Sequence, residues 1–164
     1  MLKAIAISIL VASTATACGF HLKGTAPTKN IQTLHYPNLS LDIPSAYQQL
    51  HTPLQKHLES AGIQLNGQDG KVLKIVDYQF RRQQLNGKLT EILLNLTVTF
   101  RIEDSQGKAL TQERTVRSYR NYQYNIETVN TENQQEQYLS KIMLDDIAQQ
   151  ISLQISNNRL PELK

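Results

Sequence analysis

The run Glu91-Ile92-Leu93-Leu94-Asn95-Leu96-Thr97-Val98-Thr99-Phe100-Arg101-Ile102 lies in the middle of this 164-residue chain and has an apolar residue at every second position from its first Ile. Successive side chains of a β-strand point to opposite sides, so this pattern predicts one long strand with a single buried side. We expect Leu96 and Phe100 to lie in the core and Thr97 to lie on the other side of the sheet.

The sequence on both sides of this run predicts two partner strands. Upstream, the apolar residues that are spaced to share one face are Val72, Val76, Tyr78 and Phe80. Asn86-Gly87 then predicts a hairpin, because both residue types tolerate positive φ. Downstream, Asp104 to Gly107 marks a second reversal, and Lys108 to Tyr124 predicts a third strand of weaker alternation. The middle of the chain is therefore expected to form an antiparallel meander.

The residues before the meander predict a short strand and a helix. Ile31 to Tyr36 predicts the strand, which Pro37 closes. The apolar residues that share one face of the following helix are Tyr47, Leu50, Leu54, Leu58 and Ala61. Thr52-Pro53 interrupts this pattern, so either one kinked helix spans it or a loose turn precedes a helix that starts at Pro53. Gly62 is placed to cap the end of the helix.

A second helix is predicted at the end of the chain. Thr131 to Gln134 matches a capping box, in which the first and last residues satisfy each other's free backbone amides. A broad apolar stripe follows, made of Leu139, Ile142, Met143, Ile147, Ile151 and Ile155. Asn157-Asn158 and Pro161 end the helix.

This order of elements predicts an α+β fold with two helices packed on one face of a four-stranded mixed, mostly antiparallel sheet. The first strand is expected to run parallel to its neighbour after a right-handed crossover. The other face of the sheet is rich in Gln, Asn, Thr and Arg. We expect that face to contact a polar or charged partner.

Charge and residue types exclude several classes of protein. Lys71 to Arg120 holds ten Lys and Arg against five Asp and Glu, whereas Asn121 to Lys164 holds three against six. One basic and one acidic region suit anionic and mixed partners and do not suggest a nucleic-acid scaffold. The single Cys can form neither a disulfide framework nor a thiolate metal site.

No candidate catalytic, metal or cofactor site stands out. The four His residues lack metal-ligand spacing, and no nucleophile elbow, phosphate-binding glycine loop or dinucleotide fingerprint is present. The adjacent acidic pairs Glu103-Asp104 and Asp145-Asp146 are expected at solvated turns or helix surfaces and not across a catalytic cleft. We therefore expect a protein that is not an enzyme and that needs neither a metal ion nor a cofactor.

The first residues have the order of a bacterial lipoprotein signal. A basic start, an apolar run from Ala4 to Ala12 and small residues up to Ala17 precede the only Cys, Cys18. We expect residues 1–17 to be a lipoprotein signal peptide, 18–30 to be a lipidated N-terminus and tether, and 31–164 to be a single α+β domain. The alternative is an ordinary signal cut near Ala17, which leaves Cys18 as a free thiol.

The sequence Cys18-Gly19-Phe20-His21-Leu22-Lys23-Gly24 resembles the start of mature LPS-assembly lipoproteins of the LptE family. Shorter resemblances lie near Asn86-Gly87, Arg117-Ser118-Tyr119 and Asn133 to Gln137. The resemblance implies a lipoprotein that is anchored in outer-membrane lipid through Cys18, on the periplasmic side and in the barrel lumen. It also implies that the protein plugs an LptD-like outer-membrane β-barrel and assists the assembly of lipopolysaccharide at the cell surface.

Two groups of residues are candidates for this function. Those for lipopolysaccharide binding are Arg81, Arg82 and Lys88, near the predicted hairpin tip, where guanidinium groups suit phosphates. Their alternative role is to keep an exposed hairpin soluble. Those for barrel contact are Arg117, Tyr119, Arg120 and Tyr122, because Arg and Tyr are enriched at binding hot spots. Their alternative role is that of ordinary edge-strand residues.

A second function remains open from the sequence. The chain would then be an outer-membrane lipoprotein facing the periplasm that binds a soluble ligand or a cell-wall polymer and has no barrel partner. Co-purification with a large barrel protein at fixed stoichiometry distinguishes the two.

Overall fold

The computed structural model describes residues 33–85, 90–124 and 129–163. The elements in chain order are β1 (Ser40–Asp42), the 3-10 helix η1 (Ser45–Leu50), α2 (His51–Ser60), β2 (Lys71–Leu85), β3 (Thr90–Asp104), β4 (Arg114–Tyr124) and α3 (Val129–Ser156). The predicted signal peptide, Cys18 and the tether all lie outside the described residues.

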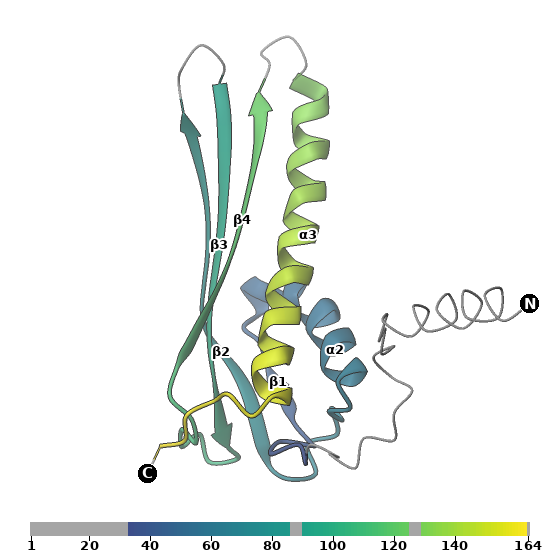
Figure 1. Cartoon of the computed structure of the whole chain (residues 1–164), viewed down its shortest axis with the longest axis vertical. Coiled ribbons are helices and arrows are strands. Elements are labelled where there is room, and N and C mark those ends of the chain that lie inside the picture. The colour runs from purple at the N-terminus through teal and green to yellow at the C-terminus, as the bar shows by residue number, and fades with distance from the viewer. Residues whose placement is uncertain (1–32, 86–89, 125–128, 164) are drawn as a thin grey trace, which may run out of the picture. The chain divides into compact units, whose positions relative to one another are not determined.

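Within the described ranges, the strands form one sheet in the order β1-β2-β3-β4. β1 runs parallel to β2, and the β2–β3 and β3–β4 pairs are antiparallel. Both described α-helices, α2 and α3, lie on the same side of the sheet (Figure 1). The predicted α+β fold, with two helices on a mixed and mostly antiparallel sheet of four strands, is confirmed.

The core is built on β3, whose alternation is that predicted from the sequence. Its buried residues, each at most 1% exposed, are Ile92, Leu94, Leu96, Val98, Phe100 and Ile102. They pack against the apolar stripe of α3 and against the buried leucines of η1 and α2, Leu50, Leu54 and Leu58. Thr97 lies on the opposite side and is partly exposed.

Val72 was predicted to share a face of β2 with Tyr78 and Phe80. This was wrong, because a β-bulge separates Val72 from them. The register of β2 against β3 shifts between Ile75 and Asp77, so the side chains change sides at Val76. Before the bulge, Leu73 and Ile75 are the buried residues, and Val72 lies on the other side. After the bulge, even-numbered residues face the helices.

The first strand was predicted at Ile31 to Tyr36, and this position is wrong. Residues 33–36 form no strand, and β1 lies further along the chain, beyond Pro37. The overlooked signal was the alternation of Leu39, Leu41 and Ile43, of which Leu39 is fully buried. Tyr36 is buried as well, but through packing against the core and not through strand pairing.

Neither of the two alternatives for the first helix is correct in detail. η1 runs directly into α2, which begins at His51, and Pro53 is its third residue. A Pro is tolerated there because the amides of the first turn have no partner within the helix. At the other end Gly62 adopts φ +85°, and the amides of Gly62 and Ile63 donate to the carbonyls of Glu59 and Leu58, each at 3.0 Å. The predicted glycine cap is therefore confirmed.

The last two elements differ from prediction only at their ends. β4 starts at Arg114 and not at Lys108, because the preceding segment makes isolated bridges to β3 and to the C-terminal tail. α3 begins at Val129, so Thr131 lies inside the helix and is not its N-cap. The reversal from Asp104 to Gly107 is confirmed. The β2–β3 hairpin is confirmed as well, and its predicted Asn86-Gly87 turn lies outside the described residues.

Candidate functional site

The side of the sheet away from the helices forms a polar surface that we call the outer face. It contains Asp77, Gln79, Arg81 and Gln83 of β2, Leu93, Asn95, Thr97 and Thr99 of β3, and Thr115, Arg117, Tyr119 and Asn121 of β4. Neither described helix covers this face. Hydrogen bonds run along it, for example from Arg81 Nη2 to Gln79 Oε1 at 2.9 Å and between the hydroxyls of Thr99 and Thr115 at 2.9 Å.

The strand register brings three of the predicted site residues together on the outer face. Arg81 lies opposite Asn95, which in turn lies opposite Tyr119, and Arg117 lies in the neighbouring row. Since adjacent strands are about 4.8 Å apart, the backbones of Arg81 and Tyr119 are about 10 Å apart. Tyr119 is 53% exposed. An exposed Tyr beside two Arg residues suits a binding surface.

The other described candidates point to the opposite side, toward α3. Arg82 Nε donates to Glu136 Oε2 at 3.1 Å, and the Tyr122 hydroxyl donates to the same oxygen at 2.9 Å. Burial raises the pKa of Tyr122 to about 12, and the hydrogen bond with Glu136 adds to this effect. Arg82 and Tyr122 therefore join β2 and β4 to the first half of α3.

A second polar contact joins β4 to α3 at Asp146, further along the helix than Glu136. Arg120 Nη2 lies 3.5 Å from Asp146 Oδ2, and the Ser118 hydroxyl donates to that oxygen at 2.6 Å. Gln150 donates to Asp146 Oδ1 at 3.2 Å and to the carbonyl of Arg117 at 3.0 Å. Asp146 lies on the surface of α3, as expected, and its side chain is 31% exposed, but its partners on β4 were not anticipated from the sequence.

Strand alternation thus divides each predicted group in two. Arg81 lies on the outer face and Arg82 faces α3, while Lys88 lies outside the described residues. In β4, Arg117 and Tyr119 lie on the outer face, whereas Arg120 and Tyr122 face α3. The sequence carried the signal for this division, since residues adjacent in a strand point to opposite sides.

A buried carboxylate, that of Glu103, lies on the outer side of the sheet near the end of β3. Glu103 is 3% exposed and accepts hydrogen bonds from Arg101 Nε at 2.7 Å and Lys74 Nζ at 3.2 Å. Burial alone would raise the pKa of Glu103, but the hydrogen bonds from Arg101 and Lys74 outweigh it and hold the pKa below its usual value. The expectation that Glu103 lies at a solvated turn was therefore wrong.

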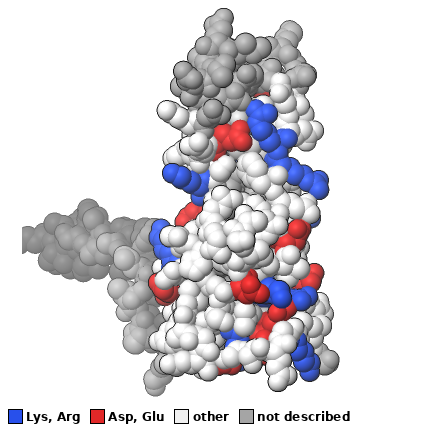
Figure 2. Space-filling view, turned by 180° about the vertical axis from the view of Figure 1, so that it is seen from behind, with Lys and Arg blue, Asp and Glu red and all other residues white. Residues whose placement is uncertain are grey.

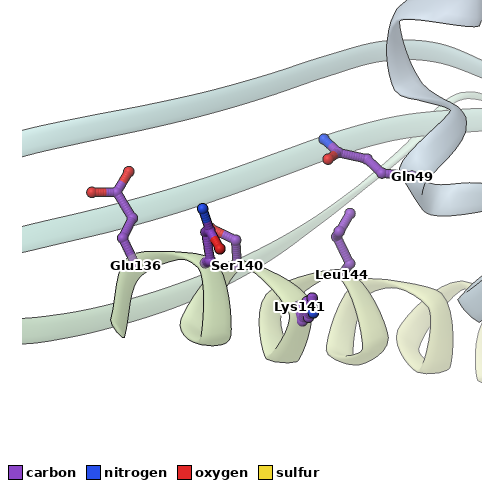
Figure 3. A pocket seen from close by; sticks show the side chains of 6 residues that line it. Gln49, Glu136, Ser140, Lys141 and Leu144 are labelled. Carbon is purple, nitrogen blue, oxygen red and sulfur yellow. The ribbon is translucent and has the colours of Figure 1, made fainter. Parts of the chain in front are cut away.

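A groove opens between α3 and the upper part of the sheet (Figure 3). Its narrow part, about 190 Å³, is lined by Gln49, Tyr78, Phe80, Leu96, Ser140 and Leu144. Its wider part, about 470 Å³, is lined by Gln49, Glu136, Gln137, Ser140, Lys141 and Leu144. Phe80 remains 38% exposed although it points toward the helices. The groove was not anticipated from the sequence.

The part of the chain that the structure describes holds neither a metal-binding cluster nor a helix that could span a membrane. No group of three or more His, Cys, Asp or Glu residues there is arranged to hold a metal ion. No described helix is both long and apolar enough to cross a bilayer. Figure 2 shows acidic and basic side chains interspersed, with a run of basic ones toward the upper end. A surface with both kinds of charge suits binding to charged partners.

The family of the chain follows from its sequence. Residues 32–155 match the LptE family, described as lipopolysaccharide-assembly. The chain belongs to the LptE family. Proteins of the LptE family are assembly lipoproteins and not enzymes, so the chain is a lipoprotein with a role in lipopolysaccharide assembly. This role is consistent with the outer membrane. A search of curated proteins gave no match.

Solved structures agree with membership of the LptE family. A minor lipoprotein from Acinetobacter baumannii, solved by crystallography, is 53% identical with a TM-score of 0.76, and the match covers 80% of this chain and 98% of that one. Two others share the fold. Rare lipoprotein B from Shewanella oneidensis has a TM-score of 0.61 at 20% identity over 74% of this chain and 96% of that one. An uncharacterized lipoprotein B from Nitrosomonas europaea has a TM-score of 0.63 at 21% identity over 86% and 92%.

Proposed function

We propose that this protein plugs and supports the β-barrel that transports lipopolysaccharide across the outer membrane. It is held on the periplasmic side by lipid on Cys18, and its folded domain enters the barrel lumen. Membership of the LptE family supports a role in lipopolysaccharide assembly. The outer face supports the finer proposal, because the lumen of a membrane barrel is polar, and a polar sheet surface with exposed Arg and Tyr complements such a wall.

The observation that carries this proposal is the uncovered outer face, on which Tyr119 projects from the edge strand β4. Tyr119 is 53% exposed and Arg117 is exposed, so both are available to a partner. Arg120 and Tyr122 do not lie on the outer face, and their proposed role is different. They hold α3 against β4 through Asp146 and Glu136, so in this proposal they support the barrel interface by positioning α3.

The direct test is co-purification from detergent-solubilised membranes. A plug elutes with one large β-barrel protein, of the LptD type, at constant stoichiometry through several chromatographic steps. A lipoprotein that binds a soluble ligand or a cell-wall polymer elutes without a barrel, and that result would support the alternative function.

The lipid anchor has its own test. Acylation at Cys18 gives a mature N-terminus whose mass includes the thioether-linked lipid, and Cys18→Ser removes it together with stable membrane attachment. An unmodified N-terminus at any other residue would show that the anchor is absent. A plug that is held by its barrel still keeps part of its membrane association in the Cys18→Ser variant.

Contact with lipopolysaccharide is proposed for the basic residues near the β2–β3 tip. Arg81 is exposed on the outer face and forms no ion pair with a described residue, so its guanidinium is available to a phosphate. Arg82 is engaged by Glu136, and its loss would also disturb α3. Arg81→Gln should therefore weaken lipopolysaccharide binding without changing the unfolding midpoint, whereas Arg82→Gln should lower both. Unchanged binding in Arg81→Gln and in Lys88→Gln would reduce these residues to a solubility role.

A further inference from the structure

The upper half of β2 is an edge of the sheet. β1 pairs with β2 only at Val72–Lys74. From Asp77 to Leu85, β2 has β3 on one side, and within the described ranges no strand lies on its other side (Figure 1). Along Asp77–Arg81, which we call the free segment, backbone amides and carbonyls on that side can pair with an added strand.

This edge lacks most of the features that usually prevent strand addition. β2 contains no Pro, and its bulge at Val76 comes before the free segment and does not interrupt it. The free segment carries one acidic and one basic side chain, Asp77 and Arg81, and each forms a hydrogen bond with the side chain of Gln79. These side chains project from one face of the sheet and not along its edge, so they do not block an approaching backbone.

A socket for one apolar side chain lies beside the edge. The narrow part of the groove measures about 190 Å³, and Phe80 and Leu96 lie at its floor with Leu144 across from them. An apolar cavity of about 150 Å³ in a protein can hold a benzene molecule. The socket therefore has room for one aromatic or branched aliphatic side chain from a strand that runs along β2.

The wider part of the groove supplies polar groups and one positive charge. Gln49 and Ser140 (Figure 3), together with Gln137, carry amide and hydroxyl groups that suit a peptide. Glu136 is already engaged by Arg82 and Tyr122, whereas Lys141 is exposed and forms no ion pair with a described residue. Arg81 lies on the other side of the same edge, also without a carboxylate partner in the described part. An occupant with acidic side chains complements both.

We propose that the free segment of β2, from Asp77 to Arg81, binds an extended polypeptide segment of another protein, which adds to the sheet as a further strand. Alternate side chains of that segment point into the groove, where one large apolar residue fills the socket, and acidic residues approach Lys141 and Arg81. Backbone pairing supplies most of the affinity and the socket supplies the selectivity. This proposal goes beyond the plug function and does not depend on contact with lipopolysaccharide.

Amide hydrogen exchange tests the backbone pairing directly. The probe is a blocked peptide of about eight residues in which Val and Phe alternate with Thr and Glu, added to the full mature chain in detergent. At saturating peptide, exchange should slow by about tenfold or more at amides of 77–81 that exchange quickly in the free protein. The control peptide has the same sequence with alternate amides N-methylated, which removes its donors along one edge, and it should give no protection.

Two matched variants test the socket. Phe80 and Val76 are both 38% exposed and lie on the same strand, but only Phe80 lines the groove. Phe80→Thr should weaken binding of the probe peptide by about tenfold, and Val76→Thr should leave it unchanged.

Three results would overturn the proposal. The first is an unchanged exchange pattern at 77–81 with peptide in large excess. The second is equal protection by the N-methylated peptide, which would mean that the groove takes apolar groups such as acyl chains without strand pairing. The third is protection that rises with protein concentration in the absence of peptide, which would identify a second copy of this chain as the occupant.

Discussion

The two sides of β4 differ in what they contact, although their residues alternate along one strand. Ser118 and Tyr122 are at most 5% exposed and bond to carboxylates of α3. Tyr119, between them, is 53% exposed on a face that neither described helix covers. A cluster of Arg and Tyr in the sequence is therefore two surfaces in the fold, one that positions α3 and one that is available to a partner. The same division separates Arg81 from Arg82 in β2.

The largest difference between the two sides is expected at the centre of β3. Leu96 is 1% exposed among core residues, so Leu96→Ala should lower the free energy of unfolding by about 2–5 kcal/mol through lost burial and a cavity. Thr97→Ala, on the outer face, should cost well under half as much. Chemical denaturation of the two variants measures both values, and equal losses would show that the assignment of faces is wrong.

The buried carboxylate of Glu103 should give the next largest effect. Glu103→Gln weakens charge-assisted hydrogen bonds to Arg101 and Lys74 and should cost about 1.5–3 kcal/mol at neutral pH. Because folding holds the pKa of Glu103 below its usual 4.5, the carboxylate stabilises the fold above that pH, and the stabilisation is lost as pH falls through the lower, folded-state value. Thermal unfolding from pH 7 to pH 3 should show this acid loss in the wild type and less of it in Glu103→Gln.

The control for this variant is Glu113→Gln. Glu113 bonds to the same Arg101 at 2.8 Å, but its side chain is 48% exposed. An exposed pair of this kind contributes little, so the control should lie within about 1 kcal/mol of the wild type. Equal effects of the two substitutions would mean that the burial of Glu103 has no energetic consequence.

A smaller effect is expected where Tyr122 bonds to Glu136. Tyr122→Phe removes one hydroxyl that is buried against α3 and should cost about 1 kcal/mol, whereas Tyr119→Phe should be neutral. The comparison is again between the two sides of one strand, and thermal unfolding of both variants measures it. A neutral Tyr122→Phe together with a destabilising Tyr119→Phe would reverse the division of β4 described above.

Much of the fold was predictable because its signals are strong and local. β3 alternates without interruption, and Gly62 stands where a helix needs a residue with positive φ. β1 was misplaced because three residues give too short an alternation to compete with a nearby apolar stretch. The prediction of which side of β2 is buried was wrong at Val72. A bulge changes the side to which every earlier residue points, and nothing local in the sequence marks the bulge.

The candidate site was predictable in composition but not in arrangement. Arg and Tyr residues were recognised as interface types, and their alternation already implied two sides. Their partners were not predictable, since Glu136 and Asp146 are brought to β4 only by the packing of α3. The groove beside Phe80 depends on the same packing together with the early end of β1, and both are properties of the tertiary structure.

The most direct test of the plug proposal compares two exposed tyrosines. Tyr119 lies on the outer face and Tyr138, on α3, is 64% exposed. Neither substitution by Ala should change stability. If the outer face contacts the barrel, Tyr119→Ala should reduce recovery of the barrel protein from detergent-solubilised membranes by about tenfold, and Tyr138→Ala should leave it unchanged. Full recovery with Tyr119→Ala, or equal losses in both variants, would contradict a barrel interface on the outer face.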